Sequence, residues 1–351
     1  PLDIACRCVT AGSHRQRDES IKMDTEIMNM LISAKADVNH CSKDGSTALF
    51  WACESDSVEL VEILLTAKAS ATNFGKDAPL PLISACKKGN SRVVKLLIQA
   101  KAAVNQCSKT ASGDGPLHMA CRRGASSTVE VLIQAKALVN QCTASGDWPL
   151  HLASKFCTLN YAATAELLIQ AKASVNQCAA SGKGPLHVAC RDGASDTVKA
   201  LIKGKASVNQ CAPSGDWPLH LACYYRFAET VEVLISAKAN VNQSSKNADK
   251  SPLFMACSRN RIKSIRMLLT AKANPNQCAD GNDSPLIVAA ADGNSNIVDV
   301  LLRSKADVNY CNSDKLNALK VACSKRHGRY GRAIVNLLLN AKAKIDQSAV
   351  H

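Results

Sequence analysis

The stretch GPLHMACRRG, from Gly115 to Gly124, decides the fold of this chain. Pro116 stands where the first turn of a helix needs no amide donor. Leu117 and Cys121 then fall on one face of that helix, and Gly124 suits the left-handed residue that ends it. A second apolar pattern with i, i+3 and i+4 spacing follows after two residues. The sequence therefore predicts two short helices in succession.

The same pattern recurs along the whole chain. An Ala-Lys-Ala tripeptide, or a near copy, follows each second helix, and its lysine returns every 33 to 37 residues. These lysines are Lys35, Lys68, Lys101, Lys136, Lys172, Lys205, Lys238, Lys272, Lys305 and Lys342. A helix pair this small cannot bury its apolar stripe alone, but stacked copies can. The length of 351 residues suggests two or three globular domains. The periodicity instead predicts a single all-α solenoid of about ten helix-turn-helix units over residues 1–351.

Three units are longer than the others. In seven of the ten units, 19 residues separate the leucine of the first helix from the lysine. The first unit carries 14 extra residues around 8–20, the fifth carries three and the last carries four. The chain starts at Pro1 inside a first unit, and its last second helix is strongly apolar. We therefore expect both ends to be truncated or covered by further chain, a domain or a partner.

The recurring unit resembles the ankyrin repeat, which has about 33 residues, a β-turn, two antiparallel helices and a Thr-Pro-Leu-His signature. The strongest matches are the Pro-Leu-His triplets that begin at Pro116, Pro149, Pro185 and Pro218. A hydroxyl at the threonine position remains only in Thr47, Ser251 and Ser284. The family usually places glycine where this chain has its ten lysines. If those residues are left-handed, each lysine costs on the order of 1 kcal/mol relative to glycine.

Seventeen cysteines are present, and 15 of them are periodic. The first-helix row, which we expect to be small buried core residues, comprises Cys6, Cys53, Cys86, Cys121, Cys190, Cys223, Cys257 and Cys323. The turn row comprises Cys41, Cys107, Cys142, Cys178, Cys211, Cys278 and Cys311. Packed helices lie about 8–10 Å apart, whereas a disulfide needs Cα atoms within about 7 Å, so we expect free thiols. Free thiols favour the cytoplasm or another reducing compartment, such as an organelle stroma or matrix, over secretion.

Chemistry for catalysis is not visible in the sequence. It contains no P-loop, dinucleotide fingerprint, zinc-protease motif or nucleophile elbow. The resemblance implies that four periodic histidines brace the turns, namely His118, His151, His187 and His220. We expect no enzyme activity, no cofactor and no metal. No run of eighteen apolar residues occurs, so no transmembrane helix is predicted.

The charge points to a binding surface. The formal net charge is +14, and the ten periodic lysines supply ten of these charges, which leaves +4. In ankyrin-like stacks the first helices and the turn tips line a concave groove, and the residues that end the first helices here are largely basic. The candidate contact residues are Lys87, Lys88, Arg122, Arg123, Trp148, Arg191, Trp217, Tyr224, Tyr225, Arg226 and Arg259. Because Arg, Tyr and Trp dominate binding hot spots, we predict a scaffold that holds a protein partner with an acidic or mixed surface.

Other functions remain open at this stage. The chain could be a structural subunit held permanently in a larger multi-protein assembly, or the interaction domain of a larger protein. The same positive field could also bind an acidic membrane surface or nucleic acid. Aromatic residues make up only 4% of the chain and are scattered, which disfavours a base-stacking platform for nucleic acid. A solvated basic face with aromatics tucked against neighbouring turns would need no partner at all.

Overall fold

The computed structural model describes residues 2–11, 17–72, 79–108, 111–245, 250–279, 283–324 and 328–344, with the side chains of 7–11, 17–24 and 328–330 left out. These residues form twenty helices, α1 to α20, and their only β pairing is an isolated bridge between Cys41 and Thr47. The all-α prediction is confirmed. The chain divides into two compact units, Pro1–Ser181 and Gly182–His351, and each is described by itself. That they form one domain, and that the ends are covered, stay predictions.

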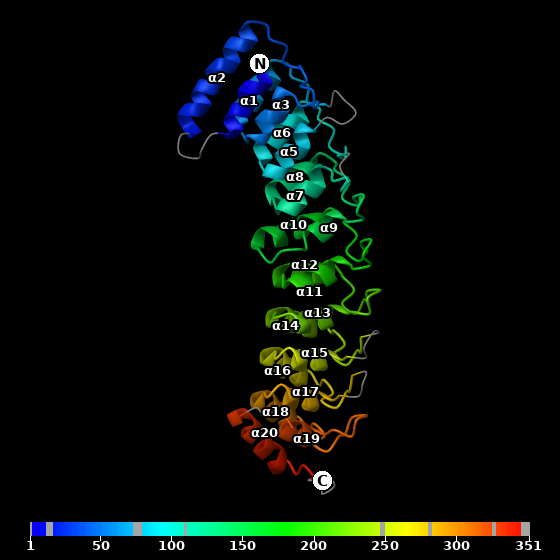
Figure 1. Ribbon diagram of the computed structural model, residues 1–351. Helices are drawn as coiled ribbons and strands as arrows, with labels where there is room; N and C mark the ends of the chain where they lie inside the picture. Colours follow the sequence, from blue (N-terminus) through cyan, green and yellow to red (C-terminus); the bar gives the residue numbers. More distant parts are fainter. Residues whose placement is uncertain are drawn as a thin grey trace. The chain divides into compact units, whose positions relative to one another are not determined.

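The first unit stacks helices in two layers (Figure 1). One layer holds the first helix of each repeat: α1 (Leu2–Ala11), α3 (Ala48–Glu54), α5 (Pro81–Lys88), α7 (Pro116–Arg123) and α9 (Pro149–Leu152). The other holds the second helices: α2 (Arg17–Ser33), α4 (Val58–Thr66), α6 (Ser91–Gln99), α8 (Ser126–Gln134) and α10 (Leu159–Gln170). Each helix packs against its counterpart in the next repeat, which is the arrangement expected of a repeat protein.

The second unit repeats this plan. Its first helices are α11 (Pro185–Asp192), α13 (Pro218–Tyr224), α15 (Pro252–Ser258), α17 (Pro285–Ala291) and α19 (Ala318–Ser324). Its second helices are α12 (Ser195–Lys203), α14 (Ala228–Ser236), α16 (Ile262–Thr270), α18 (Ser295–Arg303) and α20 (Gly328–Asn340). In both units the core lies between the two layers. In one repeat, for example, Ala120 and Cys121 of α7 are fully buried together with Val129 and Leu132 of α8.

The ten periodic lysines all adopt the left-handed conformation, with φ between 60° and 68°. Lys136 shows the reason. Its N–H donates to the carbonyl of Ile133 at 3.0 Å, and the N–H of Ala137 donates to that of Leu132 at 2.9 Å. This pair of bonds is the Schellman motif, which requires a positive φ at the residue that follows the helix cap. The condition stated above for the cost of each lysine is therefore met at all ten positions.

An asparagine after each of several second helices connects one repeat to the next. Asn140 donates through Nδ2 to the carbonyl of Lys172 at 3.2 Å, and its Oδ1 accepts from the N–H of Ser174 at 2.8 Å. The same two bonds are made by Asn39 and Asn105 in the first unit and by Asn209, Asn242 and Asn276 in the second. These asparagines hold successive lysine positions in register within each unit.

The resemblance implied that the periodic histidines brace the turns, and the structure shows two such contacts for His118 and His187 and one, from Nε2 to the carbonyl of Lys250, for His220. Nδ1 of His118 accepts the N–H of Gly115 at 3.1 Å, and its Nε2 lies 2.7 Å from the carbonyl of Gln141 in the next turn. His187 makes the equivalent two contacts in the second unit. Asn317 stands at the threonine position of the signature, and its Oδ1 accepts the N–H of Lys320 at 2.8 Å. A side-chain amide oxygen thus replaces the missing hydroxyl as the helix cap.

The longer units place their extra residues in the helices. The insertion predicted at 8–20 lies partly outside the described residues, and it coincides with the end of α1 and the start of a 17-residue α2. In the fifth repeat α9 shrinks to 4 residues while α10 grows to 12. The last unit has a 13-residue α20.

The described cysteines are free, and burial raises the thiol pKa of most first-helix members. Seven of the eight in that row are buried, as expected. Cys323 is exposed, so the prediction is wrong there. Its helix, α19, belongs to the last described repeat, and only α17 and α20 pack closely against it. The side chain of Cys8 lies outside the described residues.

Candidate partner-binding surface

The basic candidates of the first unit end two neighbouring first helices. Lys87 and Lys88 are the last residues of α5, and Arg122 and Arg123 are the last residues of α7. A left-handed glycine follows each pair and terminates the helix. Cations are stabilised there because the carbonyl end of a helix carries partial negative charge.

Two of these four cations are already paired. The guanidinium of Arg122 donates through Nη2 to both carboxylate oxygens of Asp114, at 3.1 and 3.2 Å. Lys88 lies 3.4 Å from Glu54 of the preceding repeat. Lys87 and Arg123 are exposed and form no ion pair with the described residues. These last two cations therefore carry the free charge of this surface.

An acid eight residues before a helix-ending cation is the sequence signal for such pairing. Asp114 precedes Arg122 by this spacing, and Asp147 precedes Lys155, which lies three residues after the end of the short α9 and 3.6 Å from Asp147. This spacing can be read from the sequence alone. Because the turn and the helix end fold onto each other, the two charges partly cancel.

The insertion in the fifth repeat adds apolar surface beside α7. Tyr161 donates its hydroxyl proton to the carbonyl of Arg122 at 2.8 Å, and its ring lies so close to Gly124 that a Cβ there would be 2.8 Å from a ring carbon. Phe156 packs against Tyr161 with ring centroids 4.9 Å apart. Phe156 and Leu159 remain 49% and 76% exposed. Leu159 and Tyr161 were not among the sequence candidates, although the length of the insertion marked the place.

In the second unit Arg191 is paired with its own neighbour. Its Nε and Nη2 donate to the two carboxylate oxygens of Asp192 at 2.7 and 2.9 Å, and these bonds raise the pKa of the guanidinium. Lys183 stands eight residues before Arg191, where the first unit has an acid. Asp192 is therefore the partner of Arg191, and little net charge remains at this end of α11.

The aromatic and basic candidates at the end of α13 form a cluster. The guanidinium carbon of Arg259 lies 4.1 Å from the ring centroid of Tyr224, and Nη2 of Arg259 also donates to the Tyr224 hydroxyl. Tyr225 meets Tyr224 edge to face, with centroids 5.0 Å apart and rings at 71°. Tyr225 and Arg226 are exposed. Arg259 belongs to the repeat after that of the two tyrosines, and in the structure its guanidinium stacks on the ring of Tyr224.

The two tryptophans precede first helices. Trp217 is half-buried, and its Nε1 donates to the carbonyl of Ser244 in the next turn at 3.2 Å. Trp148 has the equivalent place before α9 and is also half-buried. The indole of Trp217 thus connects two turns, which leaves only part of its ring available to a partner.

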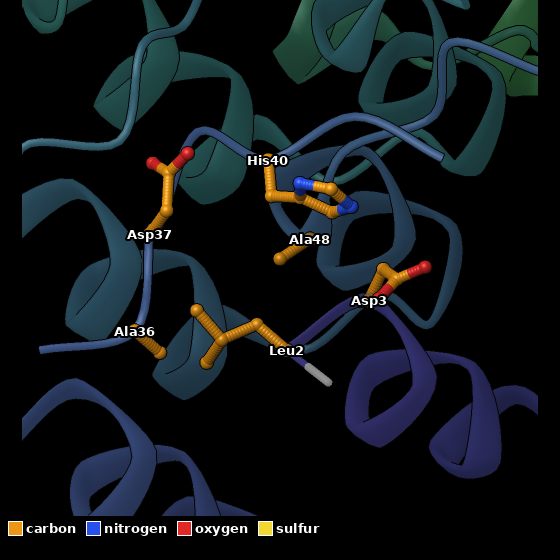
Figure 2. Close-up of a pocket in the computed structure, with 6 residues that line it drawn as sticks. All are labelled: Leu2, Asp3, Ala36, Asp37, His40 and Ala48. Carbon is orange, nitrogen blue, oxygen red and sulfur yellow. The ribbon is translucent and has the colours of Figure 1, made fainter. Parts of the chain in front are cut away.

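One cavity of about 230 Å³ lies in the first unit, lined by Leu2, Asp3, Ala36, Asp37, His40 and Ala48. Figure 2 shows the two carboxylates on opposite sides of this pocket, with His40 and Leu2 between them. Within the part of the chain that the structure describes, no group of three or more His, Cys, Asp or Glu side chains could hold a metal ion. None of the described helices is both long and apolar enough to cross a membrane.

Comparison with known proteins agrees with this architecture. A sequence profile for ankyrin repeats (3 copies) matches residues 20–106, 82–179, 157–247, 186–279 and 253–349. The chain therefore belongs to the ankyrin repeat family. Among solved structures it resembles the ankyrin repeat domain of Bcl-3, a member of the IkappaB protein family, with a TM-score of 0.56 and 26% identity. That similarity covers 65% of this chain and 99% of the Bcl-3 chain. A search of curated proteins found no match.

Proposed function

We propose that this protein is a non-enzymatic scaffold that binds a protein partner with an acidic surface through the ends of its first helices. Ankyrin repeats generally mediate protein–protein interaction, and that general function applies to this chain. The observation that carries the proposal is the cluster of Tyr224, Tyr225 and Arg259 with the exposed Arg226 beside it. Tyrosine and arginine are enriched in binding hot spots because they bury a large area and still donate hydrogen bonds.

The cluster is suited to contact for energetic reasons. An arginine stacked on a tyrosine gains about 0.5–1 kcal/mol at an exposed site, and more once water is excluded. The stacked pair is also partly ordered before a partner arrives, which lowers the entropy lost on binding. Tyr225 is 37% exposed and Arg226 is exposed, so both can reach a partner.

The first unit offers a second surface of the same kind. Lys87 and Arg123 supply unpaired charge, and Phe156 and Leu159 supply exposed apolar area. In this proposal the remaining candidates lie at the edges of the two surfaces, where they pair with acidic side chains or pack in the turns. These candidates are Lys88, Arg122, Trp148, Arg191 and Trp217.

Charge reversal with a matched control tests the proposal. Arg226→Glu with Arg259→Glu changes the cluster, while Lys263→Glu with Arg266→Glu changes two exposed cations of α16 by the same amount. Crosslinking mass spectrometry of the protein in its source extract identifies the partner for each variant. We expect the cluster variant to lose that partner and the α16 variant to keep it, both with unchanged helicity. Equal retention by the two variants would reject the cluster as the contact site.

Salt separates this proposal from a permanent structural role. An acidic partner held by exposed charges should dissociate as ionic strength rises, because salt screens such pairs. A subunit fixed in an assembly through a large apolar interface should hardly respond. The free thiols support a reducing compartment as the place where the partner is met.

A further inference from the structure

The ten left-handed lysines form two rows, one in each unit. The first lysine row is Lys35, Lys68, Lys101, Lys136 and Lys172, and the second lysine row is Lys205, Lys238, Lys272, Lys305 and Lys342. All ten side chains are exposed. Glycine would take the same backbone conformation without strain. The attraction of a lysine to the carbonyl end of the helix offsets that strain at best, so the fold alone gives little reason for ten lysines.

Nearby positions on the second helices and in the turns show that these lysines are not a by-product of repetition. The residue six positions before the lysine is acidic, basic or neutral in different repeats, as in Glu62, Lys95 and Asn336. The residue two positions after it changes as freely, for example Asp37 and Leu138. The repeats have thus diverged around a lysine that stays the same in all ten. The ammonium group is the property that the ten positions share.

Few acidic residues lie within two positions of the lysines in the sequence. The residue two positions before each lysine is never acidic in any repeat, and in two repeats it is Lys203 or Arg303. Two positions after the lysine, Asp37 and Asp307 are the acids among the ten repeats. The asparagine bonds described above hold neighbouring lysine positions in register, and packed repeats are about 8–10 Å apart. Each unit therefore presents five cations along an edge of about 30–40 Å.

The rows are separate from the partner-binding surface. The lysines follow the second helices, whereas the basic and aromatic candidates end the first helices. The two helices of a repeat are joined by a short turn and run antiparallel, so their carbonyl ends lie at opposite ends of the pair. A ligand on a lysine row would leave the first-helix ends free, and this inference does not rest on the proposed function.

We propose that each lysine row docks onto the anionic headgroups of a lipid surface. Lysine is a compact, hydrated point charge on a flexible stem, whereas arginine is the residue suited to fixed bidentate contacts. Ten lysines and no arginine at this position favour a ligand that needs no exact geometry. Lipid headgroups can move sideways to match the spacing of the row, whereas a folded acidic protein or a nucleic acid has fixed charge positions. Each lysine near an anionic membrane contributes an attraction that falls off within the screening length of the salt.

Vesicle binding by the full chain tests this proposal. The probes are phosphatidylcholine vesicles with and without phosphatidylserine, with a DNA duplex and polyglutamate as competing polyanions at the same salt. The row variant replaces all ten lysines with glycine, which suits their left-handed backbone, and lowers the formal charge from +14 to +4. The control variant places glutamate at Lys43, Lys95, Lys263, Arg266 and Arg332, five exposed residues outside the rows, and also has a charge of +4.

We expect the wild type to sediment with phosphatidylserine vesicles and not with phosphatidylcholine alone. The row variant should bind these vesicles at least about tenfold more weakly, because each lysine at the surface strengthens binding about fivefold and the variant removes more than one from each row. The control variant should stay closer to the wild type. No binding by the wild type, or equal weakening of both variants, would overturn the proposal. Tighter binding of DNA or polyglutamate than of vesicles would overturn the choice of lipid as the ligand.

Discussion

Changing Arg122 to glutamine should destabilise the first unit, while the same change at the adjacent Arg123 should not. Both are arginines at the end of α7, but only Arg122 contacts Asp114, through two hydrogen bonds. The Asp114 side chain is 9% exposed and that of Arg122 is 40% exposed. Removing Arg122 therefore leaves a nearly buried carboxylate without its cation.

The size of the effect follows from this burial. Breaking a fully buried ion pair costs about 3–5 kcal/mol, and an exposed pair is worth about 0–1 kcal/mol. Because water reaches the arginine but hardly reaches the carboxylate, we expect a loss of about 1.5–3 kcal/mol for Arg122→Gln. Arg123→Gln should stay within about 0.5 kcal/mol of the wild type, as is usual for exposed positions.

Urea denaturation with a double-mutant cycle measures this difference. Asp114→Asn alone and together with Arg122→Gln gives the coupling energy, which we expect to be about 1–2 kcal/mol. Amide exchange in the turn around Asp114 should show where the loss occurs, because a repeat protein can open locally. Similar losses of stability for the two arginine variants, or a coupling energy below about 0.5 kcal/mol, would refute the conclusion that Arg122 is held in an ion pair with Asp114.

Three further predictions concern the scaffold. Gly193→Ala should lower the free energy of unfolding, measured with urea, by about 2–4 kcal/mol, because the new Cβ would lie 2.2 Å from the Phe227 ring in a left-handed backbone. Gly89→Ala should lower it by only about 1–2 kcal/mol, since the nearest atom to its Cβ is 3.1 Å away. Equal losses for the two variants would contradict this. Burial lowers the pKa of His118 and His187, so the unfolded chain binds protons before the folded chain does as the pH falls. The urea concentration at the unfolding midpoint should therefore decrease as the pH is lowered below about 6.5, whereas a flat profile would show that these histidines do not affect stability. Replacing the turn row of cysteines with alanine should leave the melting temperature nearly unchanged, and a large drop would mean that these thiols are structural.

The fold could be predicted because it depends on short-range spacing. The signals for each helix lie within one repeat: a proline that starts the helix, a leucine inside it and a residue that ends it. A single copy of this pattern would be ambiguous, but ten copies are not. The structure shows the ten lysines to be left-handed, because the position in the repeat fixes the backbone and the residue type does not.

The surface was harder to predict because it depends on contacts between repeats and turns. The sequence showed Arg122 and Arg123 as equal cations, but Asp114 folds back onto one of them only. Arg259 was recognised as basic, whereas its stacking on Tyr224 depends on the packing of α15 against α13. The redistribution of helix length in the fifth repeat exposed Leu159, and no local pattern indicated that.

Photo-crosslinking from the tyrosine cluster tests the central claim most directly. A photoreactive amino acid placed at Tyr225 reports what touches the first-helix ends in the source extract, and the same probe at Lys263 on α16 serves as the comparison. We predict that Tyr225 crosslinks to one protein through a segment rich in Asp and Glu, and that high salt removes the product. Crosslinks that are equal at both positions, or that persist unchanged in high salt, would contradict a scaffold that holds an acidic partner at this surface.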